Sequence, residues 1–160
     1  MTEYQLLAEN GDDDAQYSMG LDYYEGRGVS KDYNEALKWF RLSAKQGNED
    51  AQYKLAFMYD NGYGTQKNYN AAYKWYLLAA KQGHSDAQNQ MGLKCNNDKN
   101  HDEALKWFQL AAKQGHSDAK YNIGFLYANK EGNYNEAIKW YRIAAEKGNA
   151  DAQWEMGYMY

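Results

Sequence analysis

The segment AQYKLAFMYDNGYGTQKNYNAAYKWYLLAAKQG, residues 51–83, is one copy of a pattern that recurs along the chain. Self-similarity at such a period predicts a stack of similar helical units, each contacting mainly its neighbours. A stack of this kind offers a long surface, which favours binding over a single catalytic cleft. The alanine that opens the pattern stands at Ala15, Ala51, Ala87, Ala119 and Ala152, so the spacings are 36, 36, 32 and 33 residues.

The first part of each copy has the spacing of an amphipathic helix. In the copy that begins near residue 14, Ala15, Met19 and Tyr23 fall on one helical face. We expect Asp14 to accept hydrogen bonds from the free N–H groups at the helix start. A Gly-x-Gly turn follows and ends this helix. Gly20, which lies next to Met19, would let a partner helix approach closely.

The second part of the copy predicts another helix. Asp32 and Glu35 are spaced as a capping box at its start. Gly47 is expected to end it in the left-handed conformation. The unit is therefore helix, turn, helix, turn. The expected apolar face of the second helix consists of Ala36, Trp39, Phe40 and Ala44.

These units predict an all-α fold, an α/α superhelical solenoid of helix-turn-helix repeats that spans residues 1–160 as a single array. About ten helices are expected, in four complete pairs and two half-pairs. The expected boundaries are a half repeat at 1–13, repeats at 14–49, 50–85, 86–117 and 118–150, and a half repeat at 151–160.

The combined pattern, Ala-x-x-x-Leu-Gly-x-x-Tyr-x-x-Gly-x-Gly-Val and then Ala-x-x-Trp-Tyr-x-x-Ala-Ala-x-x-Gly, resembles that of Sel-one-like repeats, relatives of tetratricopeptide repeats. The resemblance covers essentially the whole chain, and residues 26–29 and 75–80 fit it most closely. The third and fourth units depart from it because they lack the Gly-x-Gly turn. The resemblance implies a right-handed superhelix that acts as a protein-interaction scaffold, without enzymatic activity and without a cofactor.

Composition narrows the classes of partner. The net charge of −4 and the sequence pI near 5.4 provide no global field that attracts nucleic acid or an acidic membrane. No apolar run approaches the roughly 20 residues that span a bilayer. The first residues lack the pattern of a signal peptide, so a cytoplasmic location is favoured. Cys95 is the only cysteine, which excludes an internal disulfide framework.

Three features could suggest chemistry, but each has a simpler interpretation. The Gly-x-Gly pairs lack the Gly-Lys-Ser/Thr that completes a phosphate loop, so we interpret them as turns. His84 and His116 occupy the same slot of adjacent repeats, about 8–10 Å apart. This separation is too large for one zinc ion with bonds of about 2 Å, so surface histidines are expected. Cys95 replaces a core tyrosine, and we expect a buried, inert thiol there. We therefore predict no enzyme, no metal site and no cofactor.

A lysine recurs on the second helix of every unit, and these lysines could form a basic stripe. Lys38, Lys106 and Lys139 each follow a glutamate by three residues, and such pairs offset the charge. A solvated outer face is therefore favoured over a track for nucleic acid.

The first helices carry the candidate partner-binding positions. In tetratricopeptide arrays, the slots beside the core Leu-Gly pair face the concave groove, and here many of them are aromatic. Exposed aromatic side chains offer large contact area at small entropic cost. The alternative for the tyrosines is packing against the first helix of the next unit. Carried over, the slots are Tyr17, Leu21, Tyr24, Tyr53, Phe57, Asp60, Asn89, Leu93, Tyr121, Phe125, Trp154 and Tyr158, with Asp14, Asp50 and Asn96 flanking them.

The predicted function is thus a scaffold that binds a partner protein or peptide in the concave groove. The alternative is a self-assembling module, because core-type residues stand at both ends without a full partner unit. They are Tyr4 and Ala8 at one end, and Met156, Gly157 and Tyr160 at the other. Such ends could pair head to tail.

Overall fold

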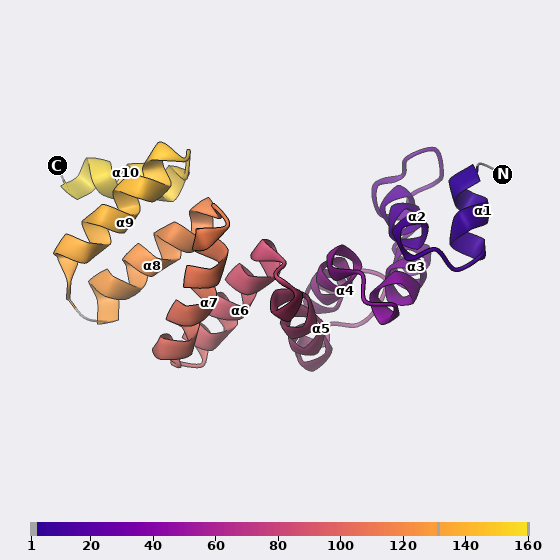
Figure 1. Ribbon diagram of the computed structural model, residues 1–160, viewed down its shortest axis with the longest axis horizontal. Coiled ribbons are helices and arrows are strands. Elements are labelled where there is room, and N and C mark those ends of the chain that lie inside the picture. Colours follow the sequence, from indigo (N-terminus) through magenta and orange to yellow (C-terminus); the bar gives the residue numbers. More distant parts are fainter. Residues whose placement is uncertain (1–2, 131, 160) are drawn as a thin grey trace. The chain divides into compact units, whose positions relative to one another are not determined.

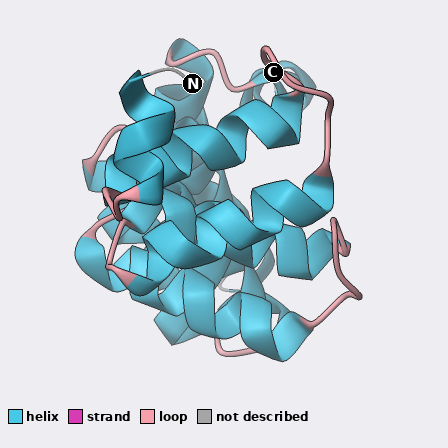
Figure 2. Cartoon of the chain, turned by 90° about the vertical axis from the view of Figure 1, so that its right-hand side faces the viewer, coloured by secondary structure: helices cyan, strands magenta, loops and turns pink. Residues whose placement is uncertain are grey.

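The computed structural model describes residues 3–130 and 132–159, and in this part of the chain the backbone forms helices and turns without a strand (Figures 1 and 2). The all-α prediction is confirmed. The ten helices of the described residues are α1 (Glu3–Glu9), α2 (Asp13–Glu25), α3 (Tyr33–Lys45), α4 (Glu49–Asn61), α5 (Tyr69–Gln82), α6 (Ser85–Asn97), α7 (His101–Lys113), α8 (Ser117–Lys130), α9 (Tyr134–Glu146) and α10 (Ala150–Met159).

The chain divides into two compact units, Met1–His84 and Ser85–Tyr160, which are described separately. In the first unit, α1 is followed by the helix pairs α2/α3 and α4/α5. In the second, the pairs α6/α7 and α8/α9 are followed by α10. Each pair is one predicted repeat, with its first helix and second helix in contact.

A small residue packed under an aromatic ring joins the two helices of each pair. A Cβ added to Gly20 would lie 2.5 Å from Cδ1 of Phe40, so only the missing side chain makes room for the ring. Gly92 lies under Phe108 and Gly124 under Tyr141 in the same way. The second pair has a fully buried alanine in the glycine slot. The four rings, all at most 2% exposed, belong to Phe40, Tyr76, Phe108 and Tyr141.

One detail of the predicted repeat was wrong. Asp12, not Asp14, caps α2, because its Oδ1 accepts from the N–H of Ala15 at 2.8 Å. Trp39 is half-buried and packs against the cluster of Ala8, Ala15 and Met19, and Leu37, at 7% exposed, adds to the core. The Asp32 cap of α3 is confirmed, since its Oδ1 accepts from two backbone N–H groups of the first turn.

A polar ladder at the start of the first helices links consecutive repeats. Asn48 caps α4 through its Oδ1, and its Nδ2 donates to Oδ1 of Asp14 in the preceding repeat at 2.9 Å. Asn149 caps α10 and donates to Asp118 at 2.6 Å in the same manner. Each link therefore satisfies a helix terminus and fixes the neighbouring repeat with the same side chain.

Histidines take this place in two repeats, which corrects their prediction as surface residues. Nε2 of His84 lies 3.2 Å from Oδ1 of Asp50, and Nε2 of His116 lies 2.8 Å from Oδ1 of Asp86. Nδ1 of His116 also accepts from the N–H of Ala119. The two histidine side chains are only 11% and 12% exposed. They are structural members of the ladder.

A second ladder consists of glutamines. Gln46 donates to the carbonyl of Gly11 and to Oε1 of Gln16, and Gln82 makes the equivalent bonds one repeat later. In the fourth repeat, lysines occupy both glutamine slots, at positions 120 and 147. A lysine has no acceptor, so this repeat cannot form the amide–amide bond.

Replacing Gly92 with alanine tests the glycine–ring contact. The new Cβ would lie closer than 3.0 Å to the buried Phe108 ring, and we expect the free energy of unfolding to fall by about 1–3 kcal/mol. Gly157→Ala is the matched control, because no atom lies within 4 Å of its added Cβ. Urea denaturation of both variants measures the difference. Equal stability of the two variants would contradict the account.

The third repeat is expected to unfold locally before the others. Cys95 is buried, at 7% exposure, where the other complete repeats carry a tyrosine, so less apolar area is removed from water. Burial raises the pKa of the Cys95 thiol, as predicted for an inert cysteine. We expect amide hydrogen exchange at residues 93–101 to precede exchange at the matching residues 57–65. Uniform protection across the repeats would overturn this expectation.

Candidate protein-binding surface

An aromatic cluster of Tyr24, Tyr33, Phe57 and Tyr63 covers one end of the first two repeats. The ring centroids of Tyr33 and Tyr63 are 4.9 Å apart and nearly parallel. Tyr24 lies 5.2 Å from Tyr33, and Phe57 lies 5.9 Å from Tyr63. Nζ of Lys54 lies 5.5 Å from the centre of the Tyr24 ring. Two predicted binding residues, Tyr24 and Phe57, therefore belong to a surface that several rings already stabilise.

The Gly-x-Gly turn of the second repeat brings this cluster together. Gly64 has a φ of +67°, and a Cβ added there would lie within 3.0 Å of the carbonyl oxygen of Tyr33. The turn thus presses its backbone against the start of α3, which places Tyr63 on Tyr33. This close approach between repeats supports the interpretation of the glycine pair as a structural turn.

Gly64→Ala tests this close approach, and Gly28→Ala is the matched control. Gly28 stands at the same place in the first repeat with a φ of +69°, but no atom lies within 4 Å of its added Cβ. Both substitutions carry the same backbone cost of about 1–2 kcal/mol, because an L-residue is strained at a positive φ. Gly64→Ala is expected to lose a further 1–3 kcal/mol or so from the clash. Thermal unfolding compares them, and an equal loss of stability would refute the role of the contact.

The tyrosines that were predicted on the first helices pack against the buried rings of their own repeats. The ring centroids of Tyr17 and Phe40 are 5.7 Å apart, and those of Tyr121 and Tyr141 are 5.5 Å apart. Tyr53 lies 5.7 Å from the Tyr76 ring and also stacks on His84 at 4.6 Å. The contact is therefore with the second helix of the same repeat, whereas the alternative prediction was the first helix of the next. All three tyrosines stay half-buried.

Burial keeps these phenols neutral. It raises the pKa of Tyr17, Tyr24 and Tyr121 above the ordinary value, and nearby carboxylates act in the same direction. It raises the pKa of Tyr141 to about 12. The surface of the first helices therefore offers uncharged rings with hydroxyl groups at physiological pH.

The third repeat has no tyrosine in this slot, and here the prediction of a solvent-facing residue was wrong. Asn89 is 6% exposed, and its Oδ1 accepts from Nδ2 of Asn122 at 2.9 Å. An asparagine carries no ring to lay over Phe108. The ring of Phe108 therefore lines a cavity of about 150 Å³ that opens between α6 and α8.

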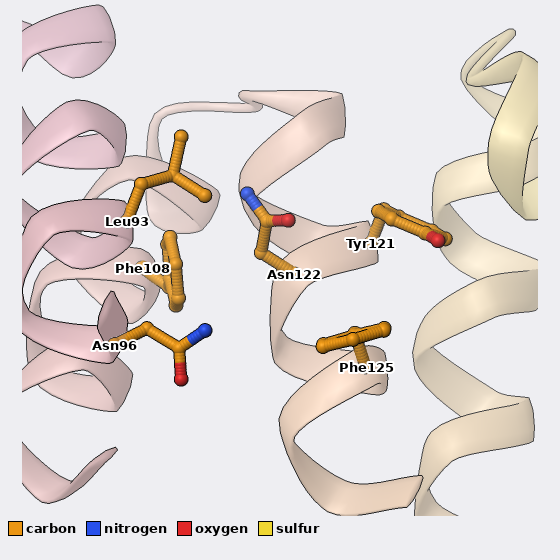
Figure 3. A pocket seen from close by; sticks show the side chains of 6 residues that line it. All are labelled: Leu93, Asn96, Phe108, Tyr121, Asn122 and Phe125. Carbon is orange, nitrogen blue, oxygen red and sulfur yellow. The ribbon is translucent and has the colours of Figure 1, made fainter. Parts of the chain in front are cut away.

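Predicted binding residues line the rest of this cavity, as Figure 3 shows. Leu93 and Asn96 come from α6, with the Phe108 ring between them in this view. Tyr121 and Phe125 come from α8, together with Asn122. A second cavity of about 190 Å³ shares Asn96 and Phe125 with the first. It continues along α6 and α8 and reaches the start of α7, and it is lined further by His101, Leu126, Asn129 and Lys130. We call the two cavities together the α6–α8 groove.

The groove is apolar on its walls and polar at one end. Phe125 is 41% exposed, so its ring offers apolar contact area to a partner. Nδ1 of His101 lies 2.8 Å from Oδ1 of Asn96, and Nζ of Lys130 lies 2.6 Å from Oδ1 of Asp102. The polar end is therefore held in place by bonds of its own.

The remaining candidates differ in their surroundings. Leu21 and Asp60 are half-buried, and Leu21 packs against the core of the first unit. Asp14 and Asp50 belong to the polar ladder, so they support the repeats. On α10, Trp154 and Tyr158 stack at 5.7 Å and are 67% and 81% exposed.

The ends of the chain fit the prediction in part. Ala8 is buried against Ala15 and Met19, and Tyr4 hydrogen-bonds Asp22, so α1 already has a partner in α2. No atom lies within 4 Å of a Cβ added to Gly157, whereas the equivalent Gly20, Gly92 and Gly124 each lie against an aromatic ring. Tyr160, the last residue named for this end, lies outside the described residues.

Glutamates offset the positive charge of lysines on the second helices, as predicted. Lys106 lies 3.5 Å from Glu103 and Lys139 lies 3.0 Å from Glu136, and Lys38 pairs with Glu35. These pairs are highly exposed and add little stability, but they dilute the positive charge. None of the helices in the described part of the chain has the length and apolar character to cross a membrane.

The Sel1 repeat family matches residues 13–48, 49–84, 85–116, 117–149 and 150–160. The chain belongs to the Sel1 repeat family. Its members are generally protein–protein interaction modules. Each matched repeat begins one residue before the unit that the sequence predicted. Among curated proteins, none matches the chain significantly.

Solved structures agree with this family. A Sel1 repeat protein from Oxalobacter formigenes is 36% identical with a TM-score of 0.88, over 92% of this chain and 62% of that one. The protective antigen c5321 of uropathogenic Escherichia coli, which has an SLR fold, is 32% identical with a TM-score of 0.73, over 98% of this chain and 43% of that one. PA5086 of Pseudomonas aeruginosa is 26% identical with a TM-score of 0.64, over 93% and 58%. The chain thus spans less than two thirds of each of these proteins.

Proposed function

We propose that this Sel1 repeat array is a scaffold that binds a segment of a partner protein across its first helices, with the α6–α8 groove as the main contact in the second unit. The observation that carries the proposal is the groove itself. Leu93, Tyr121 and Phe125 were selected from the repeat pattern as binding positions, and all three line one cavity.

The chemistry of the groove suits an apolar side chain flanked by backbone amides. The walls are leucine and aromatic rings, which supply contact area. Asn96 and Asn122 at the same cavity are amides, and each can both donate and accept hydrogen bonds. A leucine or aromatic residue of the partner would insert over Phe108, with its backbone near the asparagines.

In the first unit, the corresponding surface consists of half-buried rings. Tyr17 and Tyr53 are half-buried, and so are Tyr24 and Phe57 of the aromatic cluster. We propose that this surface contacts the partner through flat aromatic packing, while the groove takes an inserted side chain. Leu21 and Asp60 lie beside the rings and complete the proposed contact, and Trp154 and Tyr158 extend it in the second unit.

The test starts with affinity capture of a partner from the source organism, followed by titration of the purified pair. The double variant Leu93→Ala, Phe125→Ala is expected to weaken binding by about 2 kcal/mol or more, because truncated hot-spot residues cost this much. Ile143→Ala is the matched control, since Ile143 on α9 is 40% exposed, nearly the same as Phe125. Circular dichroism establishes that each variant keeps its helices. A folded double variant with unchanged affinity would reject the groove as the binding site.

Self-association is the alternative function, and the stacked, exposed rings of Trp154 and Tyr158 favour it specifically. Light scattering over a wide concentration range decides between the two. Mass that grows with concentration and is lost in Trp154→Ser, Tyr158→Ser supports assembly, and a constant monomeric mass excludes it.

A further inference from the structure

The first unit has an open cavity at residues that lie outside the proposed partner-binding positions. It measures about 330 Å³ and is lined by three helices: α1 supplies Gln5 and Glu9, α2 supplies Met19 and Tyr23, and α3 supplies Trp39. Figure 1 shows these helices at the N-terminal end of the chain. None of these five residues belongs to the proposed partner-binding positions.

The next repeat shows which chemical group fits this position. There, Arg41 stands in the slot of Gln5, Tyr59 in the slot of Tyr23, and a tryptophan in the slot of Trp39. Nη2 of Arg41 donates to the hydroxyl of Tyr59 at 2.9 Å. In the first repeat, a shorter and neutral glutamine replaces the arginine. The hydroxyl of Tyr23 makes no hydrogen bond with a described residue.

The charge of this region favours a cation. Glu9 stands where the next repeat has Lys45, and it forms no ion pair within the described residues. Residues 3–26 contain seven aspartates and glutamates and neither lysine nor arginine. The wall of the cavity is the indole of Trp39, and a guanidinium stacks favourably on an indole face.

The second unit contains the same cavity with the opposite charge. It measures about 410 Å³ and is lined by Gln109, Ala112, Lys113 and Trp140. Gln109 and Trp140 stand in the slots of Gln5 and Trp39, but Lys113 replaces Glu9. This cavity has the same aromatic wall, yet its lysine repels a cation.

We propose that the cavity between α1, α2 and α3 binds an arginine side chain presented by a basic segment of a partner protein. The guanidinium would donate to the Tyr23 hydroxyl, stack on Trp39 and pair with Glu9. It would thus reproduce from outside the contact that Arg41 makes from within the chain. Arginine is favoured over lysine because its planar group combines stacking with directed hydrogen bonds. The site does not depend on the α6–α8 groove.

The indole N–H signals of the five tryptophans provide the readout in a ¹⁵N-labelled sample. The probe is N-acetyl-arginine methylamide, and the lysine and norvaline analogues are the controls. We expect the Trp39 signal to shift along a saturable curve with arginine, to shift less with lysine and to stay in place with norvaline. Trp140 is expected to stay in place throughout. No response of Trp39 to arginine, or equal responses of Trp39 and Trp140, would overturn the proposal.

Three variants separate binding from folding. Gln5→Arg supplies the internal arginine, so the Trp39 response to the probe should disappear while the protein stays folded. Glu9→Lys reverses the rim charge and should weaken the response by about fivefold or more. Gln109→Arg makes the same change as the first variant in the second unit, and the Trp39 response should be unchanged. A folded Gln5→Arg protein that still responds at Trp39 would refute the site, because the introduced arginine should already occupy the cavity and exclude the probe.

Discussion

The contact between a glycine and an aromatic ring sets the geometry of three of the four helix pairs. Gly20, Gly92 and Gly124 each receive a ring that any larger side chain would displace. In the remaining pair, Ala56 takes the glycine slot beside the buried ring of Tyr76. Because protein interiors tolerate little overlap, this contact determines how closely the helices lie. It also determines the surface above it, since the neighbouring slot of the first helix then lies over the same ring.

That dependence explains where a groove forms. Tyr17, Tyr53 and Tyr121 cover the ring of their own repeat at centroid distances of 5.5–5.7 Å. In the third repeat, the slot holds Asn89, which turns inward and bonds Asn122. The Phe108 ring is left to line a cavity beside Leu93 and Phe125. Phe108 itself stays 1% exposed, so this departure from the repeat pattern opens a cavity beside the ring and does not expose it. The same departure is the physical basis for placing the main contact of the second unit there.

The periodic features were predictable from the sequence, because they follow from helical spacing and from repetition. The helix pairs, the Asp32 cap, the left-handed Gly47 and the inert Cys95 are examples. Features that depend on which neighbour a polar group finds were not predictable. His84 and His116 look like surface residues until the fold brings each one to an aspartate at the start of an earlier helix, Asp50 and Asp86. The buried Asn89 depends likewise on Asn122, one repeat away. Their partners lie about thirty residues along the chain, beyond the reach of local patterns.

Hydrogen exchange of the array with and without its captured partner tests the central claim most directly. The claim is that a partner lies across the first helices, with its anchor in the groove between α6 and α8. Mass spectrometry of peptic fragments then resolves each helix. Slower exchange in α6 and α8, without an equal change in α7 and α9, is the predicted result. Protection confined to α7 and α9, or absent from residues 93–96 and 121–125, would contradict the account.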